Sequence, residues 1–222
     1  MKFGVVRFPG SCDEVDAALA CEQHGEAEIL WHGDRDLKGA DAIVVPGGFS
    51  YGDYLRVGAI AQFSPVMDAV AEFARAGGPV LGICNGFQVL CEAGLLPGAL
   101  LPNSERRFLC RQVDVEVVVA DTPFTRACEA GQTLSIPVKH TTGRYYAPDA
   151  TLAEMEEAGQ VALRYAETWN PNGSVRDIAG VCSRERNVVG LMPHPEHAVD
   201  PLTGSDDGNC LFASAVTGLA AA

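Results

Sequence analysis

Cys84 lies in the segment Gly82-Ile83-Cys84-Asn85-Gly86, which has the spacing of a nucleophile elbow with a thiol in place of the hydroxyl. An apolar stretch, 79–83, precedes it and a helical pattern, 85–93, follows it, so the sharp strand-to-helix turn that the motif needs is predicted here. Such a turn places the sulfur at a helix N-terminus, which favours the thiolate. Cys84 is therefore the candidate nucleophile, and the alternative is an inert core cysteine.

A nucleophilic thiol needs an oriented base, and the chain offers five histidines. His194 stands out because it directly follows the apolar stretch 188–192, within Pro193-His194-Pro195-Glu196. Pro195 favours an extended backbone at His194, and side chains two positions apart in an extended chain point to the same side. Glu196 is thus predicted to contact the imidazole and complete a Cys-His-Glu triad, the alternative being a loop histidine beside a solvated carboxylate.

The third candidate feature is a glycine-rich loop, Pro46 to Asp53, after the apolar stretch 42–45. In a parallel sheet this loop lies beside the turn at Cys84, so the backbone N–H groups of Gly48, with Gly47 next to it, and of Asn85 could bind the oxyanion formed when a thiolate attacks a carbonyl. The loop matches neither common glycine-rich phosphate-binding motif. By itself it could be an ordinary turn, so its interest depends on its position.

The elements that must position these residues alternate between strands and helices in the first half of the chain. Apolar strands are predicted at 2–8, 27–31, 42–45 and 79–83, with helices starting at a capping box (Ser11 to Glu14), after Ser64 and at 85. The second half predicts strands at 111–119, 134–138, 161–165, 178–182 and 188–192, with few helices before a last one at about 209–219. We expect a three-layer α/β fold: a mostly parallel sheet, helices on both faces and an antiparallel or mixed extension.

Composition limits the possible partners. The chain has 222 residues and a formal net charge of −13, without the basic clusters that nucleic acid or an anionic membrane would require. No apolar run is long enough to span a membrane, and charge comes too early for a signal peptide, so a cytoplasmic location and a single domain, 1–222, are expected. In that compartment the eight cysteines are expected to stay reduced, and the absence of zinc spacing predicts no metal.

These residues resemble the triad-type (class I) glutamine amidotransferases, which carry a Gly-x-Cys-x-Gly elbow, a Gln two residues later and a late His-x-Glu. The corresponding residues here are Gly82 to Gly86 with Gln88, and His194 with Glu196. The stretches VPGGFSYGDYLRVGAIA, GICNGFQVLCEAGLLPGAL, NPNGSVRDIAG and GLMPHPEHA are similar, more narrowly, to the glutaminase subunits of phosphoribosylformylglycinamidine synthase. The similarity runs from end to end of the chain and implies the class I, flavodoxin-like fold.

The resemblance implies a subunit that hydrolyses L-glutamine to glutamate and ammonia. A separate synthetase subunit, with a small bridging subunit, would use that ammonia and ATP with Mg²⁺ to convert formylglycinamide ribonucleotide into formylglycinamidine ribonucleotide in purine biosynthesis. No cofactor is implied for this chain. Carried over by motif, Cys84 is the nucleophile, His194 the base and acid, and Glu196 its orienting residue. Gly48 and Asn85 are the oxyanion donors, with Gly47 beside them, and Gln88 is part of the glutamine pocket.

Three departures from the family pattern leave the triad intact. No Asn precedes the Cys12-Asp13 pair, Thr141-Thr142 stands after His140 where Gly-Glu is common, and His197 replaces a usual Arg. These departures affect surface contacts, such as those with the synthetase, and the residues that support the triad. His140 and His197 are the candidates for such supporting roles. Two other functions remain open at this point, a non-catalytic regulatory subunit and a stand-alone cysteine hydrolase on the same fold.

Overall fold

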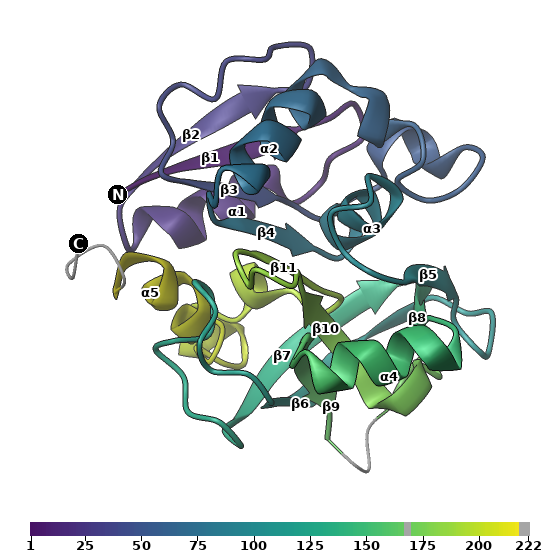
Figure 1. Ribbon diagram of the computed structural model, residues 1–222. Helices are drawn as coiled ribbons and strands as arrows, with labels where there is room; N and C mark the ends of the chain where they lie inside the picture. The colour runs from purple at the N-terminus through teal and green to yellow at the C-terminus, as the bar shows by residue number, and fades with distance from the viewer. Residues whose placement is uncertain (167–169, 218–222) are drawn as a thin grey trace.

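A nine-stranded sheet forms the centre of the molecule in a computed structural model that describes residues 1–166 and 170–217 (Figure 1). Its strand order is β2-β1-β3-β4-β11-β10-β9-β6-β7. The parallel half consists of β2 (Glu26–Trp31), β1 (Lys2–Arg7), β3 (Ala42–Val45), β4 (Val80–Ile83) and β11 (Val188–Leu191). The antiparallel half adds β10 (Ile178–Cys182), β9 (Val161–Tyr165), β6 (Leu109–Val117) and β7 (Thr133–His140).

The two halves of the sheet differ in the way their strands are buried. Every residue of β3, with the sequence AIVV, and of β4, with the sequence VLGI, is buried, because helices cover both faces of the parallel half. In β7 buried and partly exposed residues alternate along the strand, as expected where only one face meets the core. The sequence-based fold class, a parallel sheet with an antiparallel extension, is confirmed.

Five helices accompany the sheet in the described residues: α1 (Glu14–Glu22), α2 (Pro65–Arg75), α3 (Asn85–Glu92), α4 (Asp149–Glu157) and α5 (Asn209–Thr217). The chain moves from β1 through α1 to β2 on one side, and from β3 through α2 to β4 on the other. Because such crossovers are right-handed, this reversal puts α1 and α2 on opposite faces of the sheet. The reversal also opens a crevice at the carboxyl ends of β1 and β3, where the following loops diverge.

Several predicted boundaries are wrong for local reasons. Ser11 does not cap α1; its hydroxyl accepts from the Phe8 N–H at 3.0 Å, and α1 begins only after Asp13. The sequence analysis missed α4 and a separate two-stranded sheet of β5 (Ala99–Pro102) and β8 (Thr142–Tyr146). The two strands are only four and five residues long, and α4 buries only Leu152 and Met155, so each gives a weaker periodic signal than a longer element. The predicted end of the last helix, residues 218 and 219, lies outside the described residues.

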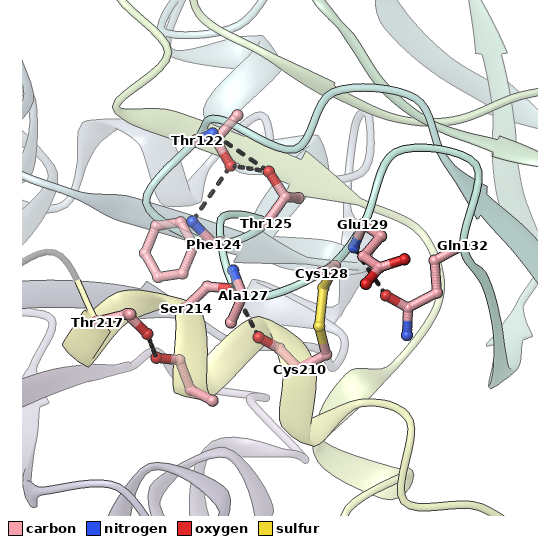
Figure 2. The surroundings of a disulfide bond; sticks show 11 residues. Thr122, Phe124, Thr125, Ala127, Cys128, Glu129, Gln132, Cys210, Ser214 and Thr217 are labelled. Carbon is pink, nitrogen blue, oxygen red and sulfur yellow. Dashed lines mark hydrogen bonds between the residues drawn. A yellow bond between two sulfur atoms is a disulfide. The ribbon is translucent and has the colours of Figure 1, made fainter.

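The expectation that all eight cysteines stay reduced is wrong for one pair. Cys128 and Cys210 form a disulfide although they are 82 positions apart in the sequence, and their Cα atoms are 5.8 Å apart (Figure 2). The contact arises because α5 packs on the loop 122–132, where the Ala127 N–H donates to Ser214 Oγ at 2.9 Å. This Cα separation lies within the range that disulfides need. The expectation of reduced cysteines rested on cellular location alone, which does not reveal that the fold brings two cysteines together.

The described residues form helices that are all short. None of them combines the length and the apolar character needed to cross a bilayer.

Candidate active site

The loops that follow β1, β3, β4 and β11 meet at the carboxyl edge of the parallel half of the sheet. They line one pocket, whose walls include Cys84, His194, Gly48 and Gln88. The loop after β3 is held to the loop after β1, because the Cys12 and Asp13 N–H groups donate to the Gly47 carbonyl at 3.3 and 3.4 Å. The structure therefore places the predicted nucleophile, base and oxyanion loop around one cavity.

Cys84 occupies the predicted elbow between β4 and α3. Its backbone has φ 49° and ψ −103°, a combination that side chains rarely adopt and that marks a strained turn. The elbow fits only because its neighbours are glycines. A Cβ at Gly82 would lie 2.9 Å from the Gly86 carbonyl carbon, and one at Gly86 would collide with the Val45 carbonyl oxygen. The thiol is 5% exposed and lies 3.9 Å from the Lys139 carbonyl oxygen.

His194 is fully buried and its Nδ1 lies 2.6 Å from Glu196 Oε1. The predicted contact is present, but its predicted geometry is only half right. His194 has φ −107° and ψ 86°, whereas Pro195–His197 forms a single 3-10 turn rather than an extended segment. The turn brings the carboxylate of Glu196 back to Nδ1 of the imidazole ring.

The charges around His194 favour its imidazolium form. Burial acts to lower its pKa, but the negative charges of Glu196 and Cys84 outweigh burial and raise the pKa to about 10. Nε2 is buried and makes no hydrogen bond with residues 1–166 or 170–217, so it is available to the thiol and to a bound substrate. This arrangement supports a thiolate–imidazolium pair.

The backbone N–H groups of Gly48 and Asn85 remain free to bind an oxyanion, since neither donates a hydrogen bond within the described part of the chain. Gly48 has φ 139°, where a side chain would be strained, and a Cβ there would lie 2.6 Å from the Cys12 nitrogen. The Asn85 side chain ties this loop to α3, because its Oδ1 accepts from the Ser50 N–H at 3.1 Å.

Gln88 lies one turn further along α3 and lines the pocket. Its side-chain amide is already engaged: Oε1 accepts from Asn85 Nδ2 at 2.9 Å, and Nε2 donates to the Thr142 carbonyl. Gln88 thus joins the elbow helix to the segment that carries Thr141 and Thr142, which both line the same pocket.

Asp13 is a site residue that sequence reasoning missed. It is 3% exposed, its Oδ1 accepts from Lys139 Nζ and lies 3.3 Å from His197 Nε2, and its Oδ2 lies 3.7 Å from His194 Nδ1. Asp13, His194, Glu196 and His197 have possible ligand atoms within 4.8 Å of one another. That spacing would suit a metal ion, but Lys139 already neutralises Asp13, and a metal would occupy the imidazole that the thiol needs as a base.

His140 is buried in the wall of the pocket and stays neutral. Burial, helped by the charge of His194, lowers its pKa to about 3. Its Nδ1 lies 3.0 Å from Asn103 Oδ1, which also accepts from the Gly143 N–H at 3.1 Å. His140 and His197 were both candidates for supporting roles, and both lie close to His194.

Comparison with known proteins gives concordant results. A family model described as a CobB/CobQ-like glutamine amidotransferase domain matches residues 1–208. A protein of Rubrobacter xylanophilus named phosphoribosylformylglycinamidine synthase subunit PurQ is 61% identical over 98% of this chain and 99% of its own length. A chain in the structure of PurLQS from Thermotoga maritima is 44% identical, with a TM-score of 0.90 and 98% of each chain covered.

The fold also extends to a more distant protein. The glutaminase domain of CTPS from Trypanosoma brucei is 18% identical over 98% of this chain and 94% of its own, with a TM-score of 0.62. This likeness concerns the fold alone.

Proposed function

The chain belongs to the CobB/CobQ-like glutamine amidotransferases and, among them, to the PurQ subunits of phosphoribosylformylglycinamidine synthase, and from this premise we propose that it hydrolyses L-glutamine at Cys84. The observation that carries the proposal is the buried His194–Glu196 pair, 2.6 Å apart, in the same pocket as a cysteine on a strained elbow. We propose that residues 1–222 act as one glutaminase unit.

The reaction begins with attack of the Cys84 thiolate on the carboxamide carbon of glutamine. The carbonyl electron pair moves onto oxygen, where the N–H groups of Gly48 and Asn85 stabilise the oxyanion. His194 then gives its Nε2 proton to the leaving nitrogen, so the C–N bond breaks, ammonia departs and a glutamyl thioester remains. Gly47 contributes by leaving room for the carboxylate of Asp13, and Gln88 holds the pocket wall at Thr142.

The second half-reaction uses the same groups in reverse order. Neutral His194 removes a proton from water, the hydroxide attacks the thioester carbon, and the C–S bond breaks to release glutamate and restore the thiolate–imidazolium pair. Glu196 keeps Nδ1 protonated throughout and stabilises the positive charge on the ring.

Ammonia released in this way serves the partner subunits. We propose that the chain assembles with a synthetase subunit and a small subunit, as in the PurLQS structure, and that the synthetase binds ATP and Mg²⁺ and uses the ammonia to make formylglycinamidine ribonucleotide. We also propose that the chain and its complex are located in the cytoplasm. The intact triad argues against a non-catalytic regulatory subunit, and the end-to-end similarity to PurQ argues against a stand-alone hydrolase.

The test is Cys84→Ala, with ammonia release and glutamate formation measured in the presence and absence of the synthetase. We expect both products to disappear while the melting temperature is kept. An electrophilic glutamine analogue should label Cys84 in the parent protein. Cys110→Ala, at an exposed cysteine outside the pocket, is the matched control and should keep full activity. Ammonia release by Cys84→Ala at the parental rate would refute the proposal.

A further inference from the structure

Three pocket residues carry a buried side-chain atom that makes no hydrogen bond within the described chain. They are His194 Nε2, His140 Nε2 and Asp53 Oδ1. The proposed reaction uses the first of these atoms. The other two are acceptors without a donor, and leaving a buried acceptor unpaired is energetically costly. The pocket is therefore complementary to a ligand that brings N–H groups.

Asp53 is held at the pocket wall by an unusual backbone. It ends the short 3-10 segment Ser50–Asp53, in which Tyr51, Gly52 and Asp53 have φ values of 54°, 71° and 55°. The segment is anchored by the Tyr51 hydroxyl, which lies 2.7 Å from His32 Nδ1 and 2.8 Å from Ser64 Oγ. Asp53 is fixed in this way and, among the residues that the structure describes, forms no ion pair. Its carboxylate is therefore available to bind a cationic group of a ligand.

The other charged groups of the pocket already have partners of opposite charge. Asp13 forms its ion pair with Lys139, and Glu196 and the Cys84 thiolate both act on His194. Asp53 is the remaining ionisable carboxyl of the lining, and burial without a counter-ion raises its pKa to about 6. Near neutral pH it presents an uncompensated negative charge, which a cationic group would stabilise.

His140 is a poorer candidate for binding a cation. Because Asn103 Oδ1 accepts from the Gly143 N–H, it is an acceptor for His140 too, so the proton sits on Nδ1 and Nε2 offers one neutral lone pair. The charge of His194 acts on His140, which places the ring toward the reacting end of the pocket. Recognition of charge therefore falls to Asp53.

We propose that the carboxylate of Asp53 binds the α-ammonium group of the amino-acid substrate, and so selects an amino acid with a side-chain carboxamide over carboxamides that lack the ammonium group. This inference deepens the proposed function and rests on it. Glutamine has one ammonium group, at the end of the molecule opposite to its reacting carboxamide. An ion pair there orients that carboxamide toward Cys84 without taking part in bond making or breaking.

The experiment compares two substrates in the assembled complex. One is glutamine, and the other is its des-amino analogue, 5-amino-5-oxopentanoate, which keeps the carboxamide and carboxylate but lacks the ammonium group. For Asp53→Asn we expect kcat/KM with glutamine to fall about 100-fold, mainly through KM, on the scale of one lost charged contact. With the analogue we expect a change below threefold, so the preference for glutamine should collapse.

Two further variants isolate the effect. Asp206→Asn removes the same charge at an exposed position outside the pocket and should change neither rate. His140→Asn keeps a donor for Asn103 but removes the Nε2 acceptor, and should lower both rates by a similar factor. Equal losses on both substrates for Asp53→Asn, or no loss on either, would overturn the inference. Failure of the parent complex to hydrolyse glutamine would instead refute the proposed function.

Discussion

Asp13 Oδ2 occupies the space beside Gly47 that a side chain at position 47 would need. A Cβ there would collide with this oxygen and would also lie 2.7 Å from His194 Cε1. The glycine of the β3 loop therefore allows the carboxylate of the β1 loop to approach the imidazole of the β11 loop. Three segments distant in the sequence meet at this point.

Gly47→Ala should consequently impair catalysis more than folding. The added methyl group must displace Asp13 or His194, and a shift of about 1 Å in a catalytic group can cost about 100-fold in rate. We expect kcat/KM for glutamine to fall by about that factor. Gly33→Ala, at an exposed position near only the Trp31 side chain, is the control for the substitution itself. Parental kinetics in Gly47→Ala would contradict the packing described.

Glu196→Gln tests the source of the basicity of His194. The negative charge of Glu196 opposes the effect of burial and helps to raise the pKa of His194 to about 10. The neutral glutamine side chain of the variant should therefore lower that pKa. The thiolate–imidazolium pair persists only below the pKa of the imidazole, and the alkaline limb of the kcat/KM profile should move to lower pH. We expect the maximum to fall about 100-fold. An unmoved alkaline limb would show that Glu196 does not set this ionisation.

Asp13→Asn should reduce stability in a pH-dependent manner. Burial disfavours ionised Asp13, but the hydrogen bonds from His197 and Lys139 and the charge of His194 outweigh burial and lower its pKa. A carboxyl with a lower pKa in the folded state stabilises the protein above its unfolded pKa of about 3.9, and this contribution is lost as the pH falls.

We therefore expect Asp13→Asn to lower the free energy of unfolding by about 2 kcal/mol near neutral pH, since Lys139 loses its partner. The difference between variant and parent should shrink toward about pH 3. Urea titrations at a series of pH values measure this effect. A difference that is constant with pH would mean that the charge of Asp13 is not responsible.

Cys128→Ser removes the disulfide to Cys210 and should lower the free energy of unfolding by about 3 kcal/mol, a usual contribution for a bridge closing a long loop. A reductant should destabilise the parent to the same extent and leave the variant unchanged. Cys110→Ser, at an exposed free cysteine, serves as the control. Eight titratable thiols in the denatured, unreduced parent would contradict the pairing.

The sequence by itself determined the local features of this protein. Gly82, Cys84 and Gly86 define an elbow because its strain and its close packing are consequences of neighbouring residues. His194 and Glu196 are near enough in the chain for their contact to be predicted, even though the 3-10 turn at Pro195 was not. The burial of whole strands such as β3 likewise follows from their continuous apolar runs.

Only the tertiary structure decided which distant groups face one another. Asp13 and His197 are 184 positions apart. They meet because β1 and β11 run parallel in the same half of the sheet, so the loops that follow them leave from the same edge and converge across the ends of β3 and β4. The same holds for Cys128 with Cys210 and for Asp53 Oδ1, whose lack of a hydrogen-bond partner among the described residues is a property of the assembled pocket. Local sequence patterns predict the conformation of the backbone. The contacts between distant side chains, and the charges that surround each of them, depend on which loops the fold brings together.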